Sequence, residues 1–202
     1  MKNLRSLLAI IDKELDGLSF DSNDRNDLSA ALFDVAIEHS KAIVVLFENS
    51  LNASSYALVR PLFESFIRAA WIQHCACDEQ IATLIKKDQF PLHLGEMLES
   101  VEKERNWVGT LSNIKKMALK NMHSYTHGGI QIVARRLKDG SLFHSIDREE
   151  INEVIKFIAL LAFLSFNEIA LIAKTSDKDN VIKKMYEDMC RCYFPKNEKG
   201  IL

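Results

Sequence analysis

The stretch REEINEVIKFIALLAFLSFNEIALIA, residues 148–173, decides the fold of this chain. It follows Asp147, which with Arg148, Glu149 and Glu150 forms the pattern of a capping box, and it is apolar around most of the helical circumference. Its longest apolar run, residues 157–166, is shorter than the roughly 20 residues that a helix needs to cross a bilayer. We therefore predict a buried helix at the centre of a bundle.

The composition of the chain agrees with an all-α domain. The 202 residues are 48% hydrophobic and 27% charged, a globular balance, and they include only 7 glycines and 3 prolines, which favours long helices over strands and turns. We predict a single helical bundle of about six to eight helices over residues 1–194, followed by a polar tail, residues 195–202. The formal net charge of −2 excludes attraction to nucleic acid by bulk charge. With no signal peptide expected, we predict a cytoplasmic protein.

Apolar residues at helical spacing predict the other elements, which are helices over residues 4–15, 28–47, 53–76, 94–105, 111–122 and 177–192. Pro61 lies within the third of these, and because the apolar pattern continues on both sides we favour one kinked helix over two separate ones. Residues 130–137 are either a helix or an extended piece, and residues 138–140 form a turn. No segment shows a clear strand period of two.

Four cysteines form two Cys-x-Cys pairs, Cys75 with Cys77 and Cys190 with Cys192. Residues two apart on a helix face different ways, which disfavours metal binding by one pair. We expect reduced thiols, and a structural zinc site made by both pairs together is the alternative.

The segment Lys120-Asn-Met-His-Ser-Tyr-Thr-His-Gly-Gly129 carries the strongest signal for chemistry. His123 and His127 have the i, i+4 spacing of metal ligands, but neither a third ligand nor an acidic base accompanies them, so we predict no metal and no cofactor. Histidine titrates near neutral pH and can move a proton, while Lys120 and Asn121 can hold a phosphate. The alternative is that both histidines are structural and bond the last carbonyls of a helix. The four other histidines, at positions 39, 74, 93 and 144, are read as structural or surface residues.

Arg60, Glu64 and Arg68 form a charged stripe at i, i+4 and i+8 on an otherwise apolar segment. One interpretation is an intrahelical Arg–Glu–Arg network with a structural role. The other is a site where either arginine binds phosphate bidentately while Glu64 orients it.

A local concentration of basic residues flanks the histidines: Lys115, Lys116, Lys120, Arg135 and Arg136. These residues are either a solvated helix face or contacts to an RNA backbone.

Lys120-Asn121-x5-His127 resembles the R-x(4–6)-H motif of the HEPN superfamily of small all-α proteins, in particular its abortive-infection and uncharacterised bacterial members. Lysine stands here where the motif has arginine. Glu64 is similar to the acidic residue that those proteins carry on an earlier helix, and the likeness covers roughly residues 30–173. The resemblance implies a helical bundle, often dimeric, in which the motif helices of two copies face each other and form a composite RNA-cleavage site. It also implies a role in bacterial defence or in a toxin–antitoxin system.

On this resemblance we expect a metal-independent endoribonuclease in which His127 is the general acid/base, Lys120 stabilises the phosphate, and Asn121 and Glu64 position the reacting groups. The residues expected to contact the substrate are Arg60, Arg68, His123 and Tyr125. The expected partners are RNA and a second copy of the chain, with no DNA and no membrane. The alternative is a catalytically inert helical module, such as an antitoxin, a scaffold or a ligand-binding bundle, that dimerises or binds a protein partner.

Overall fold

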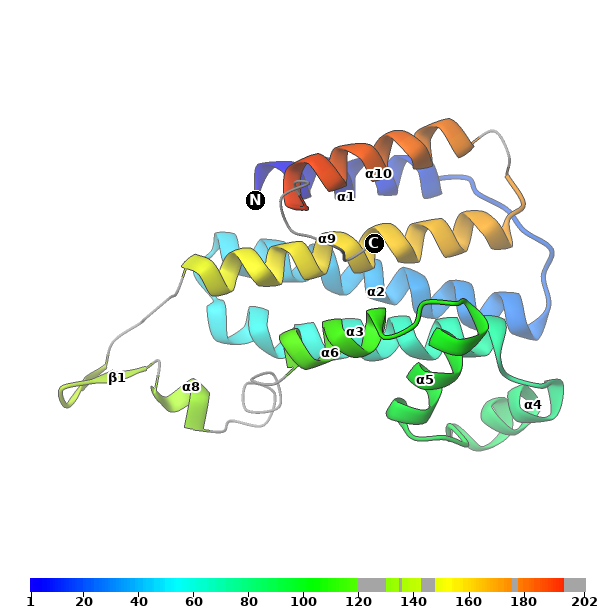
Figure 1. Cartoon of the computed structure of the whole chain (residues 1–202), viewed down its shortest axis with the longest axis horizontal. Helices are drawn as coiled ribbons and strands as arrows, with labels where there is room; N and C mark the ends of the chain where they lie inside the picture. Colours follow the sequence, from blue (N-terminus) through cyan, green and yellow to red (C-terminus); the bar gives the residue numbers. More distant parts are fainter. Residues whose placement is uncertain (120–129, 135, 143–147, 176–177, 195–202) are drawn as a thin grey trace.

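The computed structural model describes residues 1–119, 130–134, 136–142, 148–175 and 178–194, and it confirms the all-α bundle. Three long helices form its middle: α2 (Asp24–Glu48), α3 (Asn52–His74) and α9 (Arg148–Ile172). In Figure 1, α1 (Lys2–Leu15) and α10 (Asp179–Tyr193) lie beside each other along one side of this middle layer. On the other side are α4 (Asp78–Lys87), α5 (Leu94–Glu104) and α6 (Thr110–Leu119).

Contacts between the helices follow this arrangement. The most extensive is between α2 and α3, and α9 packs against α2, α3, α1, α6 and α10. A short link joins α2 to α3, in which Ser50 takes the left-handed conformation at φ 58° and the chain reverses direction. Together, α2 and α3 thereby form a helical hairpin, and α9 covers its apolar face.

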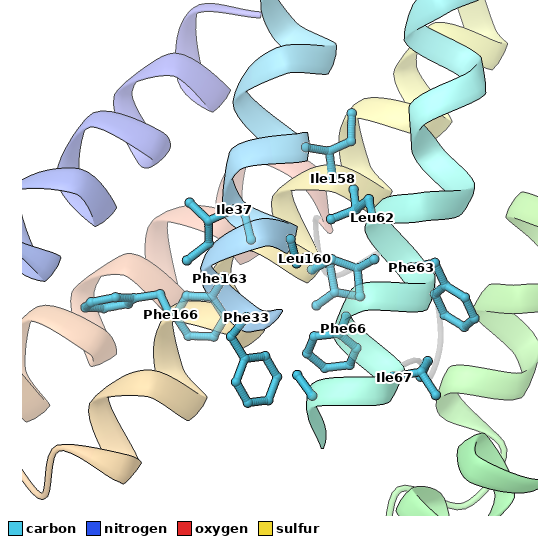
Figure 2. Close-up of a cluster of buried hydrophobic side chains, with 14 of the residues drawn as sticks. Phe33, Ile37, Leu62, Phe63, Phe66, Ile67, Ile158, Leu160, Phe163 and Phe166 are labelled. Carbon is cyan, nitrogen blue, oxygen red and sulfur yellow. The ribbon is translucent and has the colours of Figure 1, made fainter. Parts of the chain in front are cut away.

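The core lies where α2, α3 and α9 meet. Figure 2 shows Phe33 and Ile37 of α2 near Leu62 and Phe66 of α3 and the aromatic side chains of α9. The Phe33 and Phe66 rings lie 5.7 Å apart between centroids, and both side chains are fully buried. Burying a side chain of this size contributes roughly 1.5–3 kcal/mol, so this three-helix contact supplies much of the stabilisation.

The prediction of a buried core helix at residues 148–173 is confirmed by α9. Among the described residues it is the one helix long and apolar enough to cross a membrane, with a mean hydropathy of 2.0 over an 18-residue window, but 78% of that window is buried inside the bundle. The neighbouring helices therefore cover its apolar surface, as in the core helix of a soluble protein.

Pro61 lies inside α3, which runs unbroken from Asn52 to His74. The prediction of one helix rather than two is confirmed. Because proline has no amide hydrogen, the carbonyl of Ala57 loses its usual helical donor, and packing of Leu62, Phe63 and Phe66 into the core outweighs that loss.

The expectation of no strand is wrong at one place, a small antiparallel hairpin of β1 (Leu137–Lys138) and β2 (Ser141–Leu142). Asp139 and Gly140 connect the strands with φ of 50° and 76°, and positive φ at both central residues is typical of the tight turns that join hairpin strands. The segment before it divides into α8 (Ile130–Ala134) and β1, so both alternatives for residues 130–137 are partly realised. The turn at residues 138–140 is confirmed.

Candidate functional site

Two charged clusters include residues of α3, and the first is the stripe of Arg60, Glu64 and Arg68 expected from the sequence. Glu64 accepts a hydrogen bond from Arg60 Nε to Oε1 at 2.7 Å, and Arg68 Nη2 lies 3.3 Å from Oε2. The three side chains therefore form the predicted intrahelical Arg–Glu–Arg network. The side chains of Arg60 and Arg68 are 35% and 38% exposed, whereas that of Glu64 is 19% exposed, so both arginine side chains are more accessible to solvent than the carboxylate between them.

The guanidinium of Arg68 also lies over the ring of Phe90, 5.0 Å from its centroid. Phe90 in turn meets Trp71 of α3 edge-on, with 6.3 Å between ring centroids, which fixes the ring. A cation held over an aromatic face gains roughly 0.5–1 kcal/mol at an exposed position. Arg68 is thus held from two sides, by Glu64 and by Phe90, in one orientation.

With two arginines and one carboxylate, this cluster has a formal charge of one positive unit. The planar guanidinium matches the geometry of phosphate and carboxylate oxygens, and its charge persists at all physiological pH values. The arrangement can therefore receive an anion at the surface of α3. We call Arg60, Glu64 and Arg68 the α3 arginine cluster.

The second cluster surrounds Glu168 of α9, whose side chain is 1% exposed. One carboxylate oxygen lies 2.7 Å from Nε2 of His74 at the end of α3, and the other accepts a hydrogen bond from Arg105 Nη2 at 2.9 Å. The Arg105 guanidinium lies over Trp107 at 5.1 Å from the ring centroid. Three parts of the chain far apart in sequence are joined here, and we call these residues the Glu168 cluster.

The Glu168 cluster was not predicted from the sequence. The sequence predicts His74 as a structural or surface residue, but in the fold it lies beside Glu168. The available signal was Glu168 itself, a charged residue on a helix that is otherwise apolar around its circumference, because a buried carboxylate needs partners. Its two partners could not be named from the sequence.

A third carboxylate, Glu102, fixes the start of α6. It is 7% exposed and accepts hydrogen bonds from the backbone N of Ser112 at 2.7 Å and from Ser112 Oγ at 2.8 Å. A carboxylate at the first turn satisfies an amide that has no partner within the helix and interacts favourably with the helix dipole. Glu102 thereby ties α5 to α6, the helix that precedes Lys120.

The expected site residues divide into two groups. Arg60, Glu64 and Arg68 lie together on α3 as described above. The residues of the histidine segment lie outside the described residues, namely Lys120, Asn121, His123, Tyr125 and His127. A single site made by both groups stays a prediction. Of the flanking basic residues, Lys115 is half-buried on α6 and Arg136 is exposed between α8 and β1.

Burial also shifts the pKa values of groups elsewhere in the described residues. Burial lowers the pKa of His39 on α2 from its ordinary 6.5, with Glu38 opposing this effect. Burial, assisted by the charge of Glu104, raises the pKa of the Cys75 thiol. All four cysteines are free thiols. Within the described ranges, no three His, Cys, Asp or Glu side chains are grouped in a way that could hold a metal ion.

Comparison with known proteins places the chain in a family. Neither the curated proteins nor the solved structures contain a match to it. The sequence model of a family of unknown function, DUF6988, matches residues 33–195. This range covers most of α2 and all the described helices that follow it. The protein therefore belongs to the DUF6988 family.

Proposed function

We propose that this protein is a cytoplasmic, metal-independent endoribonuclease of the HEPN type that acts in bacterial defence or in a toxin–antitoxin system. His127 is the proposed general acid/base and Lys120 the cation that stabilises the phosphate. Asn121 and Glu64 are the proposed positioning residues. The proposed substrate contacts are Arg60, Arg68, His123 and Tyr125.

The observation that carries this proposal is the α3 arginine cluster. Its two arginine side chains are each more than a third exposed, Glu64 binds both of them, and Phe90 lies under the guanidinium of Arg68. A guanidinium group carries five N–H donors, so an arginine that binds Glu64 can also donate hydrogen bonds to an anion. Phosphate groups of RNA are anions of suitable geometry.

The chemistry follows from the proposed residues. His127 takes the proton of a ribose 2′-hydroxyl, whose oxygen attacks the adjacent phosphorus atom. The bond from phosphorus to the 5′-oxygen breaks, and that oxygen takes a proton from the protonated His127 as it leaves. Lys120 stabilises the charge that develops on the phosphoryl oxygens. The products are a 2′,3′-cyclic phosphate end and a 5′-hydroxyl end.

The second candidate function is a catalytically inert module that binds a protein partner or its own copy. The observation that favours it is a group of exposed apolar residues on α8 and the hairpin, where Ile130 is 73% and Leu142 is 85% exposed. Exposed apolar surface of this kind marks a protein contact. The two functions differ in whether the chain alone cleaves RNA.

The test is an RNA-cleavage assay with the purified full chain in excess EDTA. We expect cyclic phosphate ends with the wild type, and a loss of at least about 100-fold in rate with His127→Ala, the usual size of a general acid–base contribution. His93→Asn is the matched control, because His93 is an exposed residue before α5 and asparagine retains a helix-capping side chain. Unchanged cleavage by His127→Ala, or cleavage that EDTA abolishes, would contradict the proposal.

A further inference from the structure

The link between α3 and α4 carries a pair of free thiols, Cys75 and Cys77, that the proposed function does not use. Cys75 is the C-cap of α3 and Cys77 is the N-cap of α4, and only Ala76 separates them. None of these three residues is helical. The Cα atoms of residues two apart are at most about 7 Å from each other, which is the range that a disulfide can bridge. The chain itself therefore keeps the two cysteines within disulfide reach.

Burial along this link indicates that both thiols lie on its outer side. The side chain of Ala76 is 5% exposed and belongs to the core, whereas Cys75 is half-buried and Cys77 is exposed. The backbone of Cys77 is extended, with φ −82° and ψ 165°. Side chains alternate between the two sides of an extended chain, so the residues before and after an inward-facing alanine share the other side.

Arg25 of α2 holds the two ends of the link together. Its Nη1 donates a hydrogen bond to the carbonyl oxygen of Ile72 in the last turn of α3 at 2.6 Å. Its Nη2 donates a hydrogen bond to Oδ1 of Asp78, the first residue of α4, at 2.9 Å. One guanidinium thus brackets the cysteine pair. Holding two reacting groups in a fixed arrangement favours a reaction between them.

The second Cys-x-Cys pair, Cys190 and Cys192, has the same spacing but lies within α10. Residues two apart on a helix face different directions. Cys190 forms a hydrogen bond with Tyr186 one turn earlier in α10, whereas Cys192 Sγ accepts a hydrogen bond from Nδ2 of Asn3 in α1 at 3.3 Å. The two sulfur atoms therefore face different neighbours, and this pair is a matched control within the same chain.

The two thiols of the link differ in accessibility. Cys77 is exposed, and its thiol donates a hydrogen bond to the carboxylate of Glu79. Cys75 is half-buried, and burial together with the charge of Glu104 raises the pKa of its thiol, which favours the protonated form. Oxidation of cysteine follows exposure and thiolate character. An oxidant in solution therefore reacts with Cys77 first.

We propose that a peroxide converts Cys75 and Cys77 into a reversible disulfide, and that Cys190 and Cys192 stay reduced under the same conditions. The Cys77 sulfur attacks one oxygen of hydrogen peroxide, the O–O bond breaks, and the departing oxygen leaves as water with the thiol proton, which gives a sulfenic acid. The Cys75 sulfur then attacks the Cys77 sulfur, the S–O bond breaks, and the hydroxyl group leaves as water with the Cys75 proton. Two thiols lose two electrons and two protons, and one peroxide is reduced to two molecules of water. Exposed or strained disulfides are the ones that thiol reductants readily reverse.

The test treats the reduced full chain with hydrogen peroxide, blocks the remaining thiols with N-ethylmaleimide and analyses a tryptic digest by mass spectrometry. Trypsin cleaves after Arg68 and Lys86, so both cysteines of the link lie in one peptide, residues 69–86. A disulfide there removes two hydrogen atoms and prevents the addition of both maleimide groups. Cleavage after Arg191 divides the α10 pair, so a disulfide between those two cysteines would join two peptides.

We expect the disulfide in residues 69–86 to form at least about 10-fold faster than either thiol of the α10 pair is lost, and dithiothreitol to reverse it. In Cys75→Ser, a sulfenic acid at Cys77 should accumulate and be trapped by dimedone. In Cys77→Ser, oxidation of Cys75 should be slower than that of Cys77 in the wild type by about 10-fold or more. The wild type alone decides the first comparison, so it does not depend on the folding of a variant.

Three results would overturn the proposal. One is equal oxidation of the two pairs, and another is a Cys77 that proceeds to sulfinic acid while Cys75 keeps its free thiol. The third is a disulfide that joins two copies of the chain, which a non-reducing gel detects. The outcome is independent of RNA cleavage, so failure of the proposed function leaves this inference standing.

Discussion

The Glu168 cluster yields a sharp prediction for the variant Arg105→Ala. Glu168 is 1% exposed and has one bond from Arg105 and one contact with His74. Removing the guanidinium leaves a buried carboxylate without its permanent cation, and breaking a buried pair in this way costs about 3–5 kcal/mol. The Arg105 side chain is 28% exposed, so water can reach the vacated position, and the lower end of that range, about 3 kcal/mol, is expected.

A double variant separates the charge effect from general damage. In Arg105→Met/Glu168→Leu neither buried charge remains, and replacing a buried ion pair by apolar side chains of similar volume is often neutral or stabilising. We therefore expect the double variant to recover to within about 1.5 kcal/mol of the wild type. Arg5→Ala is the control for loss of an exposed ion pair, because Arg5 binds Glu48 with its side chain 65% exposed, and it should cost less than about 1 kcal/mol.

The assay is equilibrium unfolding in urea followed by far-UV circular dichroism, with the dependence of the unfolding free energy on urea compared among variants. A loss below about 1 kcal/mol for Arg105→Ala would refute the reasoning, because the bond to Glu168 would then behave as a surface pair. A double variant less stable than the single one would also refute it, since the destabilisation would then come from lost packing and not from an uncompensated charge.

Two further predictions concern single groups. Because burial lowers the pKa of His39 in the folded state, the unfolded chain binds more protons at this residue, and the free energy of unfolding falls as pH drops below 6.5. In urea unfolding at a series of pH values, His39→Gln should therefore lose less stability on acidification than the wild type. Equal pH dependence of the two proteins would contradict this prediction. Glu102→Ala should destabilise the protein by about 1 kcal/mol and reduce hydrogen-exchange protection of the Ser112 amide, whereas Glu102→Gln, which keeps an acceptor oxygen, should retain most of that protection; unchanged protection in the alanine variant would show that the amide has another acceptor.

Most of the fold could be predicted from the sequence because apolar spacing reports directly on helices. The central helix ends at Ile172, one residue from the predicted boundary, and α3 ends at His74, two residues from it. The prediction did not include α4, a helix of ten residues in which only Ile81 and Leu84 are buried. Too few turns were available there for the period to stand out.

The candidate site was less predictable for a physical reason. The α3 arginine cluster is local, with partners four residues apart on one helix, so the sequence showed it. The Glu168 cluster joins residues from α3, the end of α5 and α9, and the hydrophobic contacts of the whole bundle determine which residues meet there. No pattern along the chain contains that information.

Because α9 is synthesised after α2 and α3, the apolar faces of those two helices stay uncovered during part of translation. The ribosome completes α2 and α3 first, and at typical rates of translation several seconds, on the order of ten, pass before α9 follows. During that interval Phe33, Leu62 and Phe66 lack the helix that covers them in the finished bundle. The nascent chain is therefore most prone to aggregate, and most in need of a chaperone, in the interval that ends when α9 emerges.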